Sequence, residues 1–497
     1  MKKVLLVAVV SLGLLAGSVS SVNATSDWGD AIPIPALISL NTGANAQGNS
    51  VSCASAGNCA VTGYYQDGTG AQGFVVNQTG GTWGDAIAIP ALIGLNTGGS
   101  AAGNSVSCAS AGNCAVTGYY ADSSGRRQGF VVNQTNGTWG DAIDIPALIS
   151  LNTGANAQGN SVSCASAGNC AVTGYYNNVD GQQGFVVNQT NGTWGNAIAI
   201  PALSVLNTGG SAIGSSVSCA SAGNCAVTGY YNTTTTRQGF VVNQNNGDPW
   251  GNAIPIPALS VLNTAGDAQG TSVSCASAGN CAVTGSYADS AGGQGFVVNQ
   301  TSGTWGNAIP IPALSVLNTS GNADSNSVSC ASAGNCAVTG YYEDGDGDQG
   351  FVVNQTNGTW GDAIPIPALI DLNTAGNAGG SSVSCASAGN CAVTGSYADC
   401  AGCLQGFVVN QTNGTWGNAI AIPALSVLNT GGSAEGSSVS CASAGNCAVT
   451  GFYNNGAGPA GGIGVVPARP AGDQGFVVNL TSVVPPTDPA VVLKFTG

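Results

Sequence analysis

The sequence predicts an all-β fold, an eight-bladed β-propeller built from four-stranded antiparallel blades. Each repeating unit holds four short β-prone segments separated by Gly-rich turns, and none of them shows a helical period. Four short strands per unit are typical of a propeller blade, in which successive sheets pack around one axis. The period of 55 or 56 residues is marked by eight tryptophans: Trp28, Trp83, Trp139, Trp194, Trp250, Trp305, Trp360 and Trp416.

The unit that begins at Trp83 illustrates the four expected strands, which we name by position. Strand D covers 83–90, strand A 105–109, strand B 114–120 and strand C 128–134. Strands A and B form a hairpin around an Ala-Ser-Ala-Gly-Asn turn, in which Gly and Asn adopt conformations that other residues resist. The apolar runs lack strict alternation, as expected when neighbouring blades cover both faces of a sheet.

Prolines place strand D at the outer rim. Pro33 and Pro35 occupy alternate positions and cannot donate to a ladder, so that side of the strand must be open. They also protect the edge against pairing with other chains. The chain begins with a D segment at Trp28 and ends its last unit with a C segment at 475–480. We therefore expect the N-terminal strand to complete the last blade.

The first 24 residues predict export. A basic start, an apolar run over 4–15 and a Val-Asn-Ala cleavage signal ending at Ala24 have the form of a secretory signal. The expected organisation is a signal peptide over 1–24, an eight-repeat propeller over 25–481 and an irregular tail over 482–497. Charged residues are 6% of the chain and the net charge is −15, which argues against nucleic acid and anionic membranes as partners. We expect a monomer without membrane insertion that is secreted, periplasmic or held at the cell surface.

Cysteine spacing predicts local disulfides. Sixteen of the 18 cysteines form eight pairs with five residues between partners, and a metal site would favour Cys-x-x-Cys spacing or histidine, which this chain lacks. Cys400 and Cys403 do have that short spacing, but they lie between strands and are expected to form a local staple. The regular pairs are Cys53/Cys59, Cys108/Cys114, Cys164/Cys170, Cys219/Cys225, Cys275/Cys281, Cys330/Cys336, Cys385/Cys391 and Cys441/Cys447.

The segment Ser50-Val51-Ser52-Cys53-Ala54-Ser55, followed by Cys59-Ala60-Val61-Thr62-Gly63, recurs in every unit. It resembles the Ser-x-Ser-Cys-Ala-Ser…Cys-x-Ala-Val-x-Gly run of secreted bacterial repeat proteins that are taken as kelch-like or sialidase-repeat-like propellers. The end of the C–D turn, 136–139, is also similar to the aspartate-box turn of sialidase blades, although Gln134 stands where the aspartate belongs. The resemblance implies the architecture. It does not imply sialidase chemistry, because the required arginine cluster with a Tyr/Glu pair cannot be assembled here.

One face of the propeller carries most of the sequence variation. In an up-and-down blade the D–A and B–C loops share a face, and the B–C loops differ strongly between units whereas the A–B turn is unchanged. All four arginines lie in these loops, and all 13 tyrosines end strand B beside them. These rings could stack on a ligand or pack between the blades, and the sequence does not decide between the two roles. The candidate ligand-binding residues are Tyr65, Tyr120, Tyr176, Tyr231 and Tyr342, with Arg127, Arg237 and Asp344 as polar partners.

The loop 343–348 suggests a calcium site. Asp344, Asp346 and Asp348 alternate with glycines, which is an oxygen-rich arrangement that calcium prefers. The pattern occurs once and lacks a downstream bidentate Glu, so a solvated acidic loop is the alternative. The sequence predicts no cofactor other than this candidate calcium ion.

Three classes of function remain open. The favoured one is a surface or secreted binding and adhesion scaffold that recognises a glycan or a protein through the variable-loop face. The alternatives are a polysaccharide-active enzyme that uses paired carboxylates, and a purely structural surface protein. Enzymatic activity is the less favoured reading, because the chain has no histidine and no carboxylate pair recurs among the units.

Overall fold

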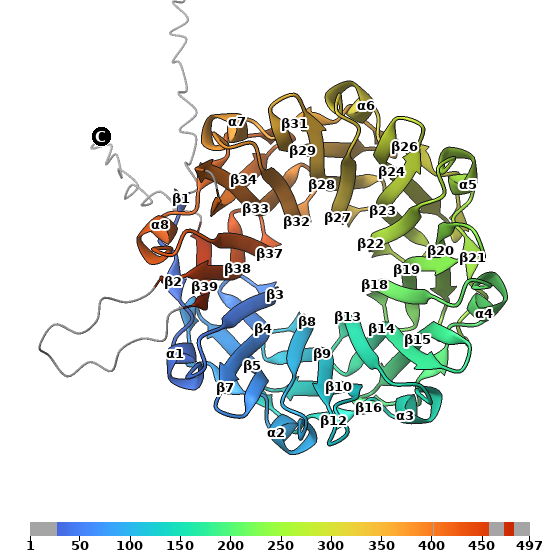
Figure 1. Cartoon of the computed structure of the whole chain (residues 1–497), viewed down its shortest axis with the longest axis vertical. Helices are drawn as coiled ribbons and strands as arrows, with labels where there is room; N and C mark the ends of the chain where they lie inside the picture. The colour runs from blue at the N-terminus through green and yellow to red at the C-terminus, as the bar shows by residue number, and fades with distance from the viewer. Residues whose placement is uncertain (1–26, 401, 457–471, 482–497) are drawn as a thin grey trace, which may run out of the picture.

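Eight antiparallel sheets form a closed ring, which confirms the predicted eight-bladed propeller (Figure 1). The computed structural model describes residues 27–400, 402–456 and 472–481. The predicted signal segment 1–24, the tail 482–497 and Arg469 lie outside the described residues. We number the blades I to VIII in chain order, and we keep the names A to D for the strand positions from the axis to the rim.

Strand A of each blade lies innermost and surrounds the axis of the ring (Figure 1). In blades I to VIII these strands are β3 (Ala46–Ser55), β8 (Ala102–Ser110), β13 (Ala157–Ser166), β18 (Ala212–Ser221), β22 (Ala268–Ser277), β27 (Ala323–Ser332), β32 (Ala378–Ser387) and β37 (Ala434–Ser443).

Strands B and C follow outward as continuous ladders, because their Val-rich and aromatic segments suit a sheet buried on both faces. The B strands are β4 (Asn58–Asp67), β9 (Asn113–Ala121), β14 (Asn169–Asn178), β19 (Asn224–Asn232), β23 (Asn280–Asp289), β28 (Asn335–Asp344), β33 (Asn390–Cys400) and β38 (Asn446–Asn454). The C strands are β5 (Gly70–Thr79), β10 (Arg127–Thr135), β15 (Gly181–Thr190), β20 (Arg237–Gln244), β24 (Gly292–Thr301), β29 (Gly347–Thr356), β34 (Cys403–Thr412) and β39 (Asp473–Thr481).

Strand D lies at the rim as predicted, but it is broken into two short pieces in most blades. Between the pieces the backbone turns to the neighbouring blade, where the Ala86 N–H donates to the Pro35 carbonyl at 2.8 Å. In blade IV only the second piece forms, since Pro249 before Trp250 has no N–H to donate. The pieces are β1 (Asp27–Trp28), β2 (Ile32–Pro33), β6 (Thr82–Trp83), β7 (Ile87–Ala88), β11 (Thr138–Trp139), β12 (Ile143–Asp144), β16 (Thr193–Trp194), β17 (Ile198–Ala199), β21 (Ile254–Pro255), β25 (Thr304–Trp305), β26 (Ile309–Pro310), β30 (Thr359–Trp360), β31 (Ile364–Pro365), β35 (Thr415–Trp416) and β36 (Ile420–Ala421).

A single helical turn follows each D strand, and the sequence did not predict it because four residues are too few to show a helical period. Each turn buries its first leucine and is preceded by an alanine in the left-handed region, such as Ala36 with φ 58°. The turns are α1 (Leu37–Leu40), α2 (Leu92–Leu95), α3 (Leu148–Leu151), α4 (Leu203–Leu206), α5 (Leu259–Leu262), α6 (Leu314–Leu317), α7 (Leu369–Leu372) and α8 (Leu425–Leu428).

The ring closes as the sequence predicted. Strands β1 and β2 pair with β39, with Trp28 opposite Leu480 and Ile32 opposite Val477. The Ala31 N–H donates across the blade boundary to the Pro423 carbonyl at 2.8 Å, as the equivalent alanines do elsewhere in the ring. The N-terminal strand therefore completes blade VIII and meets blade VII like any other rim strand.

The core lies between the blades and not within one of them. The cluster around Phe74 and Val61 of blade I also contains Ala448 and Val477 of blade VIII, and this arrangement repeats around the ring. Phe74 and its equivalent in every blade are fully buried. Each blade is therefore stabilised by the apolar surface of its neighbour.

Candidate functional site

The five candidate tyrosines Tyr65, Tyr120, Tyr176, Tyr231 and Tyr342 lie in the core. Each ring is only 4–5% exposed, and Tyr120 belongs to the cluster that contains Ile89, Leu92 and Phe130. The Tyr120 hydroxyl donates to the Asp144 carboxylate on β12, and burial together with this hydrogen bond raises its pKa. Burial also raises the pKa of Tyr342, to about 12. These rings pack the blades together and present no face on which a ligand can stack.

The first residue of each pair, which was not among the predicted candidates, lies on the variable-loop face. Around the ring these residues are Phe452, Tyr64, Tyr119, Tyr175, Tyr230, Ser286, Tyr341 and Ser396, and all are partly exposed. Five aromatic rings thus follow one another without interruption from blade VIII to blade IV. We call these five residues, Phe452, Tyr64, Tyr119, Tyr175 and Tyr230, the aromatic arc. A signal was present in the sequence, since the second position is Tyr in all eight units whereas the first varies.

The two candidate arginines lie on the aromatic arc. The Arg127 guanidinium stacks 4.4 Å from the centroid of the Tyr119 ring and lies close enough to Tyr175 of the next blade to affect the pKa of that residue. The Arg237 guanidinium stacks 4.7 Å from the Tyr230 centroid and pairs with Asp267 of blade V at 3.2 Å. Burial raises the pKa of Tyr175, and Arg127 opposes that rise. Each arginine thus holds an aromatic ring in place and carries positive charge to the surface of the arc.

Carboxylates gather on the same face in blade VI. Glu343 and Asp348 lie directly opposite each other on β28 and β29, and Asp324 on β27 lies opposite Tyr341. Burial raises the pKa of Asp324 to about 6, although Ser286 hydrogen-bonds its side chain. Burial and the neighbouring Glu343 raise the pKa of Asp348. The face is therefore polarised, with arginines in blades II and IV and this acid cluster in blade VI.

The acidic loop of blade VI is a tight hairpin. Asp344 and Gly347 pair across it, and one Asp344 oxygen accepts the Asp346 backbone N–H at 2.9 Å. Within the described part of the chain the carboxylates of Asp344, Asp346 and Asp348 do not converge on a common point. The one convergent set there is Asp399 with Cys400 and Cys403, and both sulfurs are taken up by a disulfide. The calcium site stays a prediction without a geometric cage.

All 18 cysteines are paired in nine disulfides, in the combinations that the spacing predicted. Each regular pair joins strands A and B of one blade directly opposite each other, as Cys53 and Cys59 do. This number of disulfides fits an oxidising compartment outside the cytoplasm.

The two cysteines of a regular pair differ in burial, which the spacing did not predict. The strand A member, such as Cys53, is partly buried and packs against the edge of the core cluster between two blades. The strand B member belongs to that cluster and is only 6–7% exposed. The disulfides are therefore extensions of the inter-blade core, with their strand B cysteines largely buried. The buried members are Cys59, Cys114, Cys170, Cys225, Cys281, Cys336, Cys391 and Cys447.

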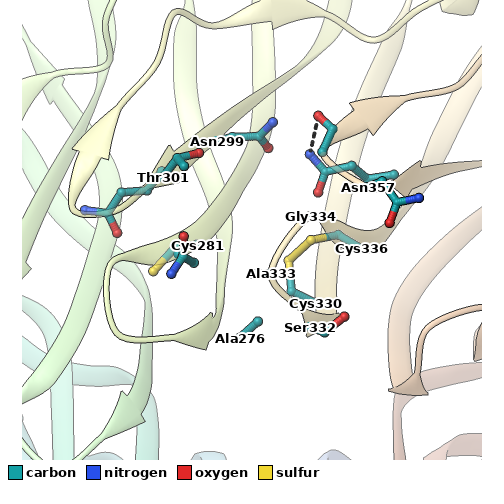
Figure 2. Close-up of a pocket in the computed structure, with 14 residues that line it drawn as sticks. Ala276, Cys281, Asn299, Thr301, Cys330, Ser332, Ala333, Gly334, Cys336 and Asn357 are labelled. Carbon is teal, nitrogen blue, oxygen red and sulfur yellow. Dashed lines mark hydrogen bonds between the residues drawn. A yellow bond between two sulfur atoms is a disulfide. The ribbon is translucent and has the colours of Figure 1, made fainter.

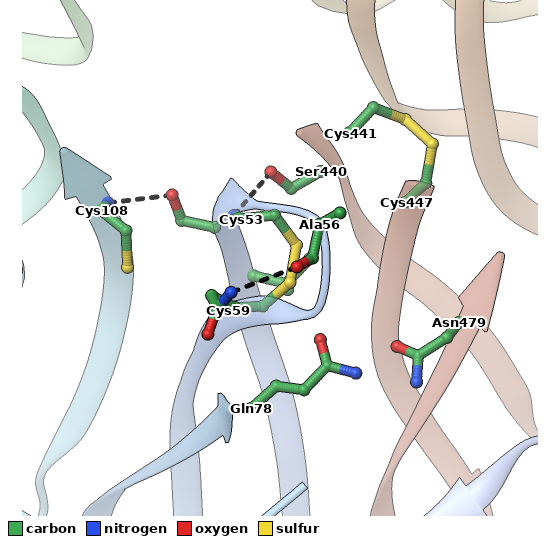
Figure 3. The surroundings of a disulfide bond; sticks show 12 residues. Cys53, Ala56, Cys59, Gln78, Cys108, Ser440, Cys441, Cys447 and Asn479 are labelled. Atoms are coloured by element: carbon green, nitrogen blue, oxygen red, sulfur yellow. Dashed lines mark hydrogen bonds between the residues drawn. A yellow bond between two sulfur atoms is a disulfide. The ribbon is translucent and has the colours of Figure 1, made fainter. Parts of the chain in front are cut away.

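The repeated serines join neighbouring blades. Ser52 Oγ accepts the Cys108 backbone N–H of blade II, and Ser440 Oγ of blade VIII accepts that of Cys53, both at 2.9 Å (Figure 3). The same bond recurs at every blade boundary. The Ser-x-Ser part of the repeat is thus explained by packing between blades.

A buried asparagine after each helical turn links three chain segments. Asn96 Nδ2 donates to the Ala71 carbonyl and to Gln72 Oε1 of blade I, both at 2.9 Å. Its Oδ1 accepts the backbone N–H groups of Ser100 and Ala121 in blade II, at 2.9 and 3.2 Å. This Leu-Asn-Thr asparagine is the same in all eight units, which is a signal of its structural role that the sequence already carried.

Fold and site define the class of protein: an eight-bladed, disulfide-stapled β-propeller with one polarised loop face. No protein-family model matches the chain, and no curated protein does. Among solved structures the chain is similar to Sqt1 from Chaetomium thermophilum, with 11% identity and a TM-score of 0.48 over 91% of this chain and 98% of that one. It is also similar to the polysaccharide lyase Uly1, with 9% identity and a TM-score of 0.44 over 74% of this chain and 88% of that one.

The chain is also similar to a prolyl endopeptidase, with 12% identity and a TM-score of 0.41 over 83% of this chain, and it spans 56% of that protein's length. Likeness at these identities concerns the fold alone. Within residues 27–400, 402–456 and 472–481 no helix is long and apolar enough to cross a membrane.

Proposed function

We propose that the protein is an exported binding module that holds a glycan chain across the aromatic arc. The observation that carries the proposal is the uninterrupted run of five partly exposed rings, two of which are stacked with arginines. Aromatic faces stack on the apolar faces of sugar rings, and guanidinium groups donate to hydroxyls and carboxylates. A surface protein anchored by the same rings is the alternative ligand, since Tyr and Arg dominate protein interfaces.

The chain supplies substitutions that test this proposal without disturbing the fold. Serine occupies the position of the first tyrosine in blades V and VII, so Tyr119→Ser and Tyr175→Ser should be accepted in blades II and III. The matched control is Tyr341→Ser, because Tyr341 lies between two serine-bearing blades and outside the aromatic arc. The Tyr119→Ser/Tyr175→Ser protein, Tyr341→Ser and the parent should unfold at similar temperatures.

A glycan array followed by titration calorimetry on the best ligand is the experiment. We expect the Tyr119→Ser/Tyr175→Ser protein to bind at least about 10-fold more weakly than the parent, since each buried aromatic contact contributes about 1 kcal/mol or more. Tyr341→Ser should bind normally. Equal binding by all three proteins overturns the proposal. Absence of any glycan ligand, with capture of a surface protein that depends on Tyr119, assigns the arc to a protein partner instead.

A carboxylate-based polysaccharide hydrolase is the second candidate. The observation that favours it is the set of carboxylates in blade VI, where burial raises the pKa of Asp324 to about 6 and Glu343 lies opposite Asp348 on the neighbouring strands. Hydrolysis needs one carboxyl group that stays protonated and one that is ionised. Release of reducing ends from a polysaccharide panel, lost in Asp324→Asn, would support this activity. Binding without such release leaves the module as a scaffold.

A further inference from the structure

Polar pockets recur between neighbouring blades on the face opposite the aromatic arc. This face carries the A–B and C–D turns, which scarcely vary along the chain. The pockets have volumes of about 230–280 Å³ and lie at the boundaries I/II, II/III, III/IV, V/VI and VI/VII. Each is lined by equivalent residues of the two blades that it separates.

The pocket between blades V and VI shows the construction. Cys281, Asn299 and Thr301 of blade V lie on one side, and the Cys330–Cys336 disulfide and Asn357 of blade VI lie on the other (Figure 2). The A–B turn of blade VI, with Ser332, Ala333 and Gly334, borders the mouth. The wall thus combines an apolar disulfide with amide, hydroxyl and backbone groups.

Hydrogen bonds fix the orientation of the amides that line this pocket. Asn299 Oδ1 accepts the indole N–H of Trp360 from blade VI at 3.1 Å, which leaves its Nδ2 as the remaining donor. Gln300 and Gln355 each donate Nε2 to a turn carbonyl, of Gly303 and Gly358, at 3.2 Å, which leaves their Oε1 atoms as acceptors. The pocket therefore presents a preset pattern of one amide donor and two amide acceptors.

The chemistry of the lining selects for an uncharged ligand. None of the residues that line the five pockets is Asp, Glu, Lys or Arg, and none is aromatic. A charged group would lose its hydration there without gaining an opposite charge. A hydroxyl can both accept from an amide N–H and donate to an amide oxygen, so it matches this pattern in both directions.

One blade breaks the pattern. The glutamine that corresponds to Gln78 and Gln300 is present in blades I to VII, whereas blade VIII has Leu480, which is 3% exposed and pairs with Trp28. Leucine at this position is thus compatible with a closed blade. It gives a matched substitution that removes the amide of a pocket and keeps the side chain buried.

We propose that these inter-blade pockets each bind one neutral, hydroxyl-rich group, the sugar residue of an uncharged polysaccharide, so that the invariant face holds a polymer at several equivalent sites. Repetition of one small site around a rigid ring raises the overall affinity for a repeating ligand well above that of a single site. The site is distinct from the aromatic arc and does not depend on the function proposed for that arc.

The test uses the whole exported protein and two kinds of probe. Crystals are soaked in neutral monosaccharides (galactose, glucose, mannose and N-acetylglucosamine), and retention is measured on immobilised uncharged polysaccharides. The variants are Gln300→Leu for the crystals and Gln78→Leu/Gln189→Leu/Gln300→Leu/Gln411→Leu for retention. Tyr341→Ser is the control, since it lies on the opposite face and outside the aromatic arc. Tyr119→Ser/Tyr175→Ser is measured beside it to report any retention by the arc itself.

We expect a sugar in the parent pockets, lost at the V/VI boundary in Gln300→Leu and kept at I/II and VI/VII. The four-leucine protein should bind the polymer at least about 10-fold more weakly, whereas Tyr341→Ser should bind it normally. Pockets that hold only water in every soak overturn the proposal. So does polymer retention that the four leucines leave unchanged, and retention lost only in Tyr119→Ser/Tyr175→Ser assigns the polymer to the arc.

Discussion

Replacing Asn96 with alanine should destabilise the ring measurably, because this one side chain makes four hydrogen bonds across the boundary of blades I and II. A net contribution of roughly 0.5–1.5 kcal/mol per bond gives about 2–6 kcal/mol. The unfolding entropy of a domain of this size is on the order of 0.9 kcal/mol/K, so the melting temperature should fall by about 2–6 °C. Calorimetry of Asn96→Ala measures this shift directly.

The control for this measurement is Asn245→Ala, which removes an exposed asparagine amide from the C–D turn of blade IV. Hydrogen exchange adds a local readout, since the Ala121 amide loses its acceptor in Asn96→Ala and should exchange faster than in the parent. If Asn96→Ala and Asn245→Ala melt together and the Ala121 amide keeps its protection, the asparagine does not join the blades.

Three further predictions follow from disulfides, closure and charge. Cys108→Ala/Cys114→Ala removes the disulfide of one hairpin and should lower the free energy of unfolding by about 2 kcal/mol. Small-angle scattering should still show a closed ring, and an open or dissociated particle would contradict this. Deleting 27–35 exposes the edge of β39 and should lower the melting temperature and cause association in sedimentation, whereas deleting 485–497 should leave both unchanged. Since the pKa of Asp324 is raised to about 6, the folded state keeps a proton that the unfolded chain loses near pH 4, and this stabilisation fades as the pH rises through 6. In denaturant titrations, the free energy of unfolding of Asp324→Asn minus that of the parent should therefore be larger at pH 7.5 than at pH 4.5. An equal difference at the two pH values would refute the raised pKa of Asp324.

The propeller architecture could be predicted because the same four strand segments occur in each of eight units. The prolines also identified the rim strand from the sequence alone. The apolar pattern within one unit could not show which of two adjacent tyrosines faces the core. Strand B is covered on both faces, so the residues next to Tyr119 and Tyr120 in the sequence are similarly apolar. A shift of one residue would exchange which ring is buried and which is partly exposed. Comparison of the units would have decided it, since Ser286 replaces the first residue and Tyr287 keeps the second.

The break in strand D and the pockets were beyond the sequence for a different reason. Both arise from contacts between units, such as the bond from Ala86 to Pro35 or the one from Trp360 to Asn299. A repeat shows what lies within one blade, whereas the angle and the distance between two blades follow from how side chains interlock across the boundary.

The closing strand is the first part of the propeller to be synthesised and the last to reach its partner. Trp28 pairs with Leu480, whereas every other rim strand meets a C strand only a few residues away. In the unfolded chain, closing so long a loop costs about 4 kcal/mol more than closing a short turn. The eight rim segments are also nearly interchangeable, so an unclosed N-terminal strand can be captured by an earlier C strand in a register displaced by whole repeats. Each rim segment that pairs with the C strand just before it removes an edge that could otherwise capture the N-terminal strand.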